Sequence, residues 1–326
     1  MADALSFVVE ESQTGQRLDL FLTAHLEKYS RSRIQRWIES GHVTVNGHAE
    51  KARTVVRSSD RVAVTVPEFA ALPDASSAEI EILFEDKDLL VVNKPAGVVV
   101  HPAGRNERDT LVQLLWPHLG KRWAGLLDEN GSVRGSSNPE TNRPGVVHRL
   151  DKGTSGVIVL AKSPESATAL CDQFASRSVK KEYRALVWGE LSFKKGSIES
   201  PVGRSFQDPK RMDVSTGRWS ATDIQVLDVF DRGEAGVFSY LDVRPRTGRT
   251  HQIRVHLSAL GHPVVGDDVY GKKAGEFITP VERPMLHAYR LSFLHPRTRK
   301  PCSFTAEIPR DLGAILKSLR ARRSPR

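Results

Sequence analysis

Cysteine is scarce in this sequence. Only Cys171 and Cys302 occur in 326 residues, and neither belongs to a CxxC pair or to a cluster with histidine. The ligand spacings of a zinc site are therefore missing, and we expect no metal centre. Cys171 falls within a helical pattern and is expected to be a buried thiol. So few cysteines fit a reducing compartment.

Long apolar runs and cofactor motifs are missing too. No stretch approaches the ~18 consecutive apolar residues that a membrane-spanning helix needs. The N-terminus, Met1 to Ser6, lacks the basic and apolar regions of a signal peptide. No Walker motif, GxGxxG or HExxH occurs. We therefore expect a cytoplasmic protein that has no membrane partner and needs no cofactor.

Positive charge, in contrast, is in excess. The chain has 48 Lys and Arg against 39 Asp and Glu, which gives a net charge of +9. Such a balance suits a polyanionic partner, and nucleic acid is the commonest one. A basic protein without such a partner would have the same composition, so charge alone supports RNA binding only weakly.

One stretch combines apolar residues, glycines and charge: Pro144 to Gly156, which reads PGVVHRLDKGTSG. The pattern predicts a strand, a tight turn and a second strand. Asp151 lies at the turn between Arg149 and Lys152, and nearby positive charge favours its ionised form. Such a carboxylate suits nucleophilic or general-base chemistry. A surface hairpin with a solvated ion pair would have the same sequence, and these residues alone leave both readings open.

The run from His148 to Asp151, followed by KGTSG, resembles the signature of the RluA-type pseudouridine synthases, which isomerise uridine to pseudouridine in structured RNA. Two later stretches resemble further motifs of that family: KEYRALV around Tyr183 and TGRTHQIR from Thr247 to Arg254. The resemblance implies that Asp151 is the essential carboxylate and that Arg249 pairs with it. It implies that Tyr183 stacks on the target uracil and is placed to take part in proton transfer.

The same resemblance implies two substrate contacts and a mechanism without a cofactor. Arg149 would fill the gap left by the flipped nucleotide, as a planar cation can, and Leu286 would line the uracil pocket. The bond from ribose to the ring nitrogen breaks, the uracil rotates, and C5 is joined instead, so no atoms are gained or lost. Whether Asp151 attacks the ribose, adds to the ring or removes a ribose proton stays open.

The N-terminal part has the pattern of a small basic module. Leu18, Phe21 and Leu22 fall on one face of an amphipathic helix, a second helix ends near Gly41, and strands surround an Asn46-Gly turn. This order of elements resembles the alpha-L RNA-binding domain of the S4 type, whose second helix and following loop meet RNA. The resemblance implies RNA contacts by Arg31, Ser32, Arg33, Arg36 and Lys51.

We therefore predict an α+β protein with an S4-type domain at residues 15–72 and a linker at 73–79. A mixed, mainly antiparallel pseudouridine synthase catalytic domain would occupy residues 80–312, and a frayed basic tail residues 313–326. Within the catalytic domain we expect a short helix at 110–117 and a long loop at 122–143. The polar, basic stretch 201–221 is either a hairpin that contacts RNA or a solvated loop.

Other details remain less defined. In the family-like NKPAG element, Pro95 and Gly97 would shape a turn, with a phosphate contact of Lys94 as the alternative. The family-like element from Gly266 to Gly271 is expected to be structural, and His251 and Gln252 are expected to order a turn and not to take part in chemistry.

The predicted function, as the resemblance to the ribosomal large-subunit (RluC/RluD-like) branch of the family implies, is an RNA pseudouridine synthase that acts on large-subunit (23S) ribosomal RNA. The same chemistry on transfer RNA, or a noncatalytic RNA-binding role in ribosome assembly, is the alternative. A glycosidase is disfavoured because it usually needs two carboxylates flanking the bond. We expect the protein to be a monomer.

Overall fold

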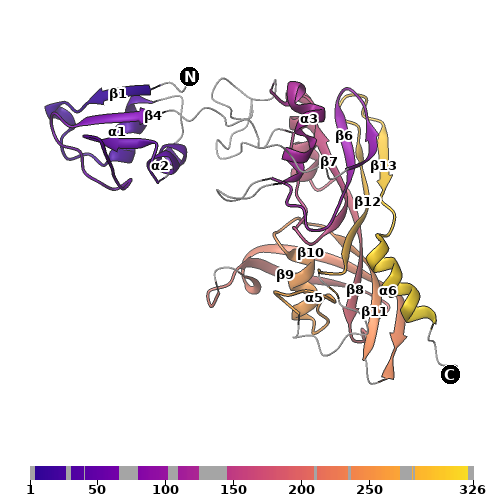
Figure 1. Ribbon diagram of the computed structural model, residues 1–326. Helices are drawn as coiled ribbons and strands as arrows, with labels where there is room; N and C mark the ends of the chain where they lie inside the picture. Colours follow the sequence, from indigo (N-terminus) through magenta and orange to yellow (C-terminus); the bar gives the residue numbers. More distant parts are fainter. Residues whose placement is uncertain are drawn as a thin grey trace. The chain divides into compact units, whose positions relative to one another are not determined.

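The computed structural model describes residues 4–26, 31–39, 41–65, 80–101, 109–124, 145–208, 211–233, 236–271, 281 and 283–321. The chain divides into two compact units, one that contains the described residues up to 65 and one that contains most of those from 80 onward (Figure 1). The predicted linker at 73–79 lies outside the described residues, and so does most of the predicted long loop. No described helix is long and apolar enough to cross a membrane.

The first unit packs two helices against a small antiparallel sheet of order β1-β4-β2-β3. Its elements are β1 (Ala4–Val8), η1 (Glu11–Gln13), α1 (Leu18–His25), α2 (Arg31–Glu39), β2 (Val43–Val45), β3 (His48–Ala49) and β4 (Arg61–Thr65). The predicted helical stripe is confirmed, because Leu18, Phe21 and Leu22 are fully buried in this unit's core. Asn46 and Gly47 form the predicted turn between β2 and β3, both with positive φ.

The second unit is built on a nine-stranded sheet of order β5-β6-β7-β12-β8-β11-β10-β9, with β13 paired to β12. Its elements are β5 (Glu81–Glu85), β6 (Leu89–Lys94), α3 (Leu111–Ala124), β7 (Ser155–Ala161), α4 (Pro164–Ala175), β8 (Lys180–Trp188), β9 (Lys195–Arg204), β10 (Met212–Asp231), β11 (Val237–Pro245), α5 (Gln252–Ala259), β12 (Leu286–Leu294), β13 (Pro301–Thr305) and α6 (Arg310–Ala321). Among the described strands, β7 and β12 are the one pair that runs parallel, so the predicted mixed, mainly antiparallel α+β fold is confirmed.

Helices cover the sheet where the site will lie. All seven residues of β7 are buried, so this strand reads as a continuous apolar run instead of alternating. Figure 1 shows α5 on one side of the β8–β11 region and α6 on the other. Ile253 and Leu257 of α5 and Leu312 and Leu316 of α6 belong to one core with β8 and β11.

The C-terminal segment differs from the prediction. Residues 313–321, which we expected to belong to a frayed basic tail, are part of α6. The reason is an apolar stripe at helical spacing, since Leu312, Ile315, Leu316 and Leu319 are all buried. The basic residues that the structure describes in this segment, Lys317 and Arg320, are exposed on the same helix.

Three smaller expectations are also corrected. The helix expected at 110–117 continues through Pro117 to Ala124, because Leu115, Leu119 and Trp123 extend its buried stripe at four-residue spacing. Cys171 is exposed, although its neighbour Leu170 on α4 is buried. The first strand of the signature is reduced to a single bridge between Val146 and Leu160.

Candidate active site

The second unit contains a cavity of about 380 Å³ between the signature loop, β8 and the connection from β11 to α5. This volume lies within the range of small-molecule sites. Its walls include Asp151, Tyr183 and Leu286, together with both Arg149 and Arg249. The five residues predicted for this domain therefore line one cavity, although they come from four separate segments of the chain.

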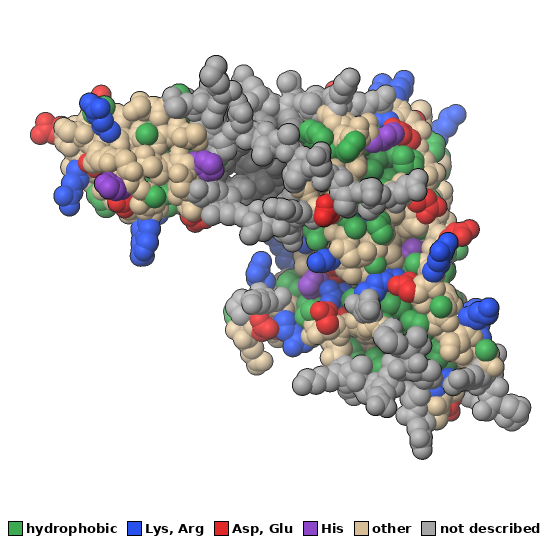
Figure 2. Space-filling view, viewed as in Figure 1, with side chains coloured by type: hydrophobic (Ala, Val, Ile, Leu, Met, Phe, Trp, Pro, Cys, Tyr) green, Lys and Arg blue, Asp and Glu red, His purple; other side chains and the backbone are tan. Residues whose placement is uncertain are grey.

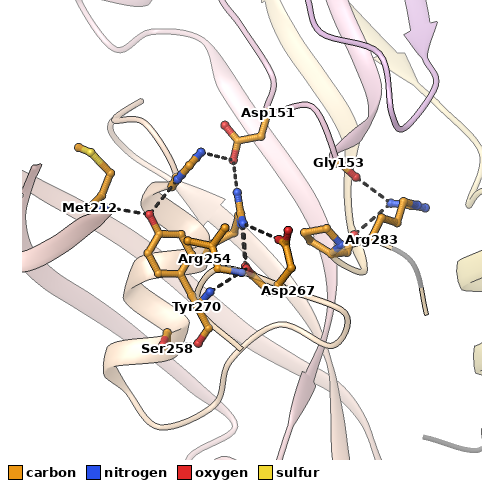
Figure 3. Close-up of polar contacts among 12 residues, drawn as sticks. Asp151, Gly153, Met212, Arg254, Ser258, Asp267, Tyr270 and Arg283 are labelled. Carbon is orange, nitrogen blue, oxygen red and sulfur yellow. Dashed lines mark hydrogen bonds and ion pairs between the residues drawn. The ribbon is translucent and has the colours of Figure 1, made fainter. Parts of the chain in front are cut away.

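The loop that carries Asp151 is held by close contact with the chain around β12. Gly156, the second residue of β7, has φ +116°, and a Cβ atom there would lie 2.1 Å from the carbonyl oxygen of Ala288. Arg283 donates through Nη1 to the carbonyls of Gly153 at 3.2 Å and Leu286 at 3.3 Å, as Figure 3 shows for Gly153. Because Arg283 also forms an ion pair with Asp311 at the start of α6, this helix helps to position the signature loop.

The arginine beside Asp151 is Arg254. Its Nη1 lies 3.5 Å from Oδ2 of Asp151 (Figure 3). Arg254 is itself fixed by Asp267, whose carboxylate accepts from Nε at 2.6 Å and from Nη2 at 2.8 Å. Burial alone would raise the pKa of Asp267, but its hydrogen bonds with Arg254 outweigh that effect and lower it. A bidentate pair of this kind aims the remaining nitrogen of Arg254 at Asp151.

The predicted pairing of Arg249 with Asp151 is wrong for the described structure. Arg249 lies in the turn before α5, where its backbone N–H donates to Oε1 of Gln252 at 3.1 Å. Gln252 also accepts from the hydroxyl of Thr247, so its side chain orders the turn as expected. Arg249 lines the cavity, and its buried Nε has no hydrogen-bond partner among the described residues. Arg254, five residues later, lies in the first turn of α5, and this position places its side chain beside Asp151.

Tyr183 and Leu286 sit on adjacent strands at the cavity wall. Leu286 of β12 and Ala185 of β8 are register partners, which places Leu286 near Tyr183. Burial, together with the negative charge of Asp151, raises the pKa of Tyr183 well above its ordinary value. The phenol is therefore protonated at neutral pH, so a resting phenolate is not available as a base.

Two polar residues of the family-like motifs have structural roles. His148 stacks on Phe174 with ring centroids 4.5 Å apart and accepts a hydrogen bond from the N–H of Val159. Burial lowers its pKa to about 3, so it stays neutral. Lys94 is fully buried, and its Nζ donates to the carbonyls of Pro95 and Val98. A phosphate contact by Lys94 is therefore excluded in this arrangement.

The cavity is strongly cationic. Asp151 is its single acidic lining residue, against six Lys and Arg: Arg149, Arg177, Lys181, Arg246, Arg249 and Arg254. Arg246 forms ion pairs with Asp223 and Glu199, whereas Arg149, Arg177 and Arg249 have no acidic partner within the described part of the chain. In Figure 2, Lys and Arg side chains gather on the second unit near α5 and β9. Unneutralised cations around one carboxylate suit a polyanionic substrate.

The first unit also presents ordered arginines. Asp19 is fully buried and accepts hydrogen bonds from Arg17, Arg31 and Gln35. The side chains of Arg17 and Arg31 are nevertheless 45% and 46% exposed, so one carboxylate aligns two surface guanidinium groups. Lys51 is exposed and lines a hollow together with Arg17. The side chains of Ser32, Arg33 and Arg36 lie outside the described residues.

Several residues around Asp151 were missed by the sequence analysis. Asp267 and Tyr270 were assigned only to a structural element, and Arg254 and His251 were quoted within a motif without a contact to Asp151. His251 Nε2 lies 4.0 Å from Oδ2 of Asp151, and its Nδ1 lies 2.8 Å from the hydroxyl of Tyr270. The motif from Thr247 to Arg254 could have indicated these contacts, because Arg249, His251 and Arg254 are all candidate partners for the Asp151 carboxylate.

Among the described residues, one group of side chains is close enough together to hold a metal ion: Asp86, Asp88 and His295. These groups already have other partners. Nε2 of His295 lies 2.8 Å from Asp86, and Arg297 forms an ion pair with Asp88. The cluster is therefore explained as an ion-pair network between the β5–β6 and β12–β13 turns.

Comparison with known proteins agrees with the motifs and the fold. Residues 88–259 match the family described as RNA pseudouridylate synthase, and residues 16–62 match the S4 domain. The chain belongs to the RNA pseudouridine synthase family. It is therefore an isomerase that carries an N-terminal S4 RNA-binding domain.

Its relatives cover nearly the whole chain. An uncharacterized RNA pseudouridine synthase of Chlorobaculum parvum is 39% identical, with 96% of both chains covered. YlyB of Bacillus subtilis, also an uncharacterized RNA pseudouridine synthase, is 38% identical, with 97% and 98% covered. The ribosomal large subunit pseudouridine synthase D of Zymomonas mobilis is 38% identical, with 95% of both covered.

A solved structure shares the fold of this pseudouridine synthase. The structure of human RNA Pseudouridylate Synthase Domain Containing 1 is 28% identical, with a TM-score of 0.53. The match covers 77% of this chain and 99% of that one.

Proposed function

We propose that this pseudouridine synthase modifies specific uridines of large-subunit ribosomal RNA, with Asp151 as its essential carboxylate. The observation that carries the catalytic assignment is the meeting of Asp151, Tyr183 and Leu286 in one cationic cavity. The ribosomal substrate is supported by relatives of 34–38% identity that are named ribosomal large subunit pseudouridine synthase D. Other relatives of equal similarity have names without a substrate.

In the proposed reaction, the target uridine leaves the RNA stack and enters the cavity. An extracted base needs a new stacking surface, which the ring of Tyr183 supplies, while Leu286 closes the apolar side of the pocket. Arg149, which is exposed at the cavity rim, fills the gap left in the RNA.

Asp151 then acts on the nucleotide. It attacks the ribose, adds to the ring or removes a ribose proton, and the position of its carboxylate beside Arg254 suits each of these steps. Because the phenol of Tyr183 is protonated, it serves as a proton donor or carrier when the C5 proton is moved, and not as a pre-formed base. The uracil rotates and rejoins the ribose through C5, which requires no cofactor.

The S4 unit would hold a distant RNA element. Arg31, Arg33, Arg36 and Lys51 are proposed to contact phosphates, with Arg17 aligned beside Arg31 by Asp19. The tethered grip would raise the local concentration of RNA at the cavity. We further propose that the protein acts in the cytoplasm as a monomer.

The test compares the wild-type protein with Asp151→Asn on protein-free large-subunit ribosomal RNA and on bulk transfer RNA. Pseudouridine is mapped by chemical labelling and primer extension. We expect new pseudouridine at discrete ribosomal sites, and none with Asp151→Asn although that variant still binds RNA. Product only in transfer RNA would refute the ribosomal substrate, and an active Asp151→Asn variant would refute the assignment of the carboxylate.

A further inference from the structure

We propose that His251 is a positioning residue for Asp151: in the reacting complex its Nε2–H donates to Oδ2 of the carboxylate, and Tyr270 holds the imidazole in the tautomer that can do so. This inference rests on the proposed role of Asp151 as the essential carboxylate.

The geometry places His251 between two groups. Its Nδ1 lies 2.8 Å from the hydroxyl of Tyr270, and the two rings meet edge to face with centroids 5.6 Å apart. Its Nε2 lies 4.0 Å from Oδ2 of Asp151. Each ring nitrogen therefore faces one polar partner, and both partners belong to the immediate surroundings of the cavity.

The hydrogen atoms can be assigned from chemistry. The hydroxyl oxygen of Tyr270 accepts from the backbone N–H of Met212 at 2.9 Å (Figure 3), and a backbone N–H can only donate. The phenol keeps its own hydrogen, because burial raises the pKa of Tyr270. Nδ1 of His251 is the acceptor that the described residues offer to that hydrogen. With Nδ1 accepting, the proton of a neutral imidazole sits on Nε2, facing Asp151.

His251 is neutral in the resting site. Burial lowers its pKa, the charge of Asp151 opposes that shift, and the charge of Arg254 adds to it. A neutral imidazole has one ring proton, and when Nδ1 accepts a hydrogen bond that proton must be on Nε2. The orientation of Nε2–H toward the carboxylate is thus determined by Tyr270 and does not depend on Asp151 itself.

The backbone supports the same arrangement. His251 immediately precedes α5 and has a left-handed conformation with φ +56°. Arg254 follows in the first turn of that helix, so α5 presents two donors to the same oxygen of Asp151, Nη1 at 3.5 Å and Nε2 at 4.0 Å. The other oxygen, Oδ1, accepts no hydrogen bond from the described residues. We infer that Oδ2 is the anchored oxygen and Oδ1 the one presented to the nucleotide.

At 4.0 Å the contact from His251 is longer than a hydrogen bond. Catalytic contacts are often long in the absence of substrate and tighten in the complex. The inferred bond therefore forms as the transition state is reached, so its effect should appear in the chemical step and not in RNA affinity.

Two substitutions separate the contacts of the two nitrogens. His251→Asn keeps an acceptor where Nδ1 lies and loses the donor toward Asp151. His251→Gln places an amide N–H near the position of Nε2 and restores that donor. Asparagine tolerates the left-handed backbone better than glutamine, so backbone strain alone would harm the Gln variant more. The inference predicts the opposite order of activities.

The assay is single-turnover pseudouridine formation, with enzyme in excess over whichever RNA the wild-type protein modifies. We expect His251→Asn to lower the rate constant about tenfold, the lower end of the effect of a hydrogen bond to a charged group. His251→Gln should retain most of the rate, and both variants should keep the RNA Kd and the Tm of the wild type. His118→Asn, which replaces a half-exposed histidine outside the cavity, is the control and should behave as wild type.

Several outcomes would overturn the inference. A wild-type rate for His251→Asn would do so, as would equal loss in the Asn and Gln variants, because equal loss indicates a packing role. If His251→Asn does not fold, Tyr270→Phe provides the comparison: it keeps the imidazole but removes the phenol hydrogen, and an unchanged rate would refute the tautomer assignment. Absence of product with the wild-type protein on both RNAs would instead refute the proposed substrates.

Discussion

Replacing Asp267 should damage both stability and catalysis, because this buried carboxylate holds the arginine that contacts Asp151. In Asp267→Asn the amide oxygen can still accept from the backbone N–H groups of Val269 and Tyr270, which both donate to Oδ1. The amide nitrogen then takes the place of Oδ2 and faces Nε of Arg254, which now lies 2.6 Å from that oxygen. Two donors would meet there, so the guanidinium would keep its contact through Nη2 but lose the second contact that fixes its orientation.

The size of the effect follows from burial. The Asp267 side chain is fully buried and that of Arg254 is 7% exposed. Removing one partner of a buried ion pair costs about 3–5 kcal/mol when the remaining charge is uncompensated, and here Asp151 at 3.5 Å compensates Arg254 in part. Since the substitution keeps the volume and the three hydrogen bonds to Oδ1, we expect about 3 kcal/mol, or a fall in Tm of roughly 6–12 °C for a unit of this size.

The adjacent residue offers a matched control. Asp268 lies 3.8 Å from Nη2 of Arg254, but its side chain is 85% exposed. Asp268→Asn removes the same charge and should change stability by less than about 0.5 kcal/mol. Both variants are compared with wild type by urea unfolding and by the single-turnover rate. Equal stability of the two variants would refute the reasoning, as would a wild-type rate for Asp267→Asn.

The pH dependence gives an independent check. The pKa of Asp267 is lowered in the folded state, so the unfolded state binds its proton first on acidification. Its stabilising effect is present above the unfolded pKa of about 3.9 and is lost as pH falls through the folded value. The stability difference between wild type and Asp267→Asn should therefore be full at neutral pH and shrink below about pH 4.

Three further predictions concern other residues. Burial lowers the pKa of His287 to about 4, so between pH 6.5 and 4 the unfolded state binds a proton that the folded state does not. Between pH 7 and 5, His287→Gln should therefore lose about 2 kcal/mol less stability than the wild type. Equal losses of the two proteins in urea unfolding would contradict this. Arg31→Gln should lower the slope of log Kd against log salt by about 1 in RNA-binding titrations and leave the saturated single-turnover rate unchanged; an unchanged slope would remove Arg31 from the phosphate contacts. Tyr183→Phe keeps the stacking ring and loses the proton, so RNA Kd should stay near wild type while the single-turnover rate falls about 100-fold or more; a wild-type rate would limit Tyr183 to stacking.

Local patterns predicted the elements well. The spacing of Leu18, Phe21 and Leu22 is enough to define the buried face of α1, because that face is set by helix geometry alone. The same signal was present in Leu312, Ile315 and Leu316, but the high Lys and Arg content around them suggested a frayed tail. Composition was a poorer guide there than periodicity, since charged residues fill the exposed face of a packed helix.

The site was predictable only as far as the family motifs reach. The resemblance brought Asp151, Tyr183 and Leu286 together, and the structure places all three at one cavity. It did not determine which arginine meets the carboxylate, because Arg249 and Arg254 are only five residues apart in one motif. That choice depends on where α5 begins and on the bidentate contact with Asp267, and both are tertiary features.

Asp267 also shows why the division between structural and catalytic motifs fails here. Its segment was read as a structural turn, yet its carboxylate aims Arg254 at Asp151, and Tyr270 in the same turn orients His251. Arg254 and His251 both approach Oδ2, which leaves Oδ1 toward the cavity. A carboxylate anchored through one oxygen can present the other in a fixed direction, and this is the requirement shared by attack on the ribose, addition to the ring and removal of a ribose proton. On the proposed assignment of Asp151, the turn at 266–271 would therefore contribute to the chemistry, whichever of the three steps Asp151 performs.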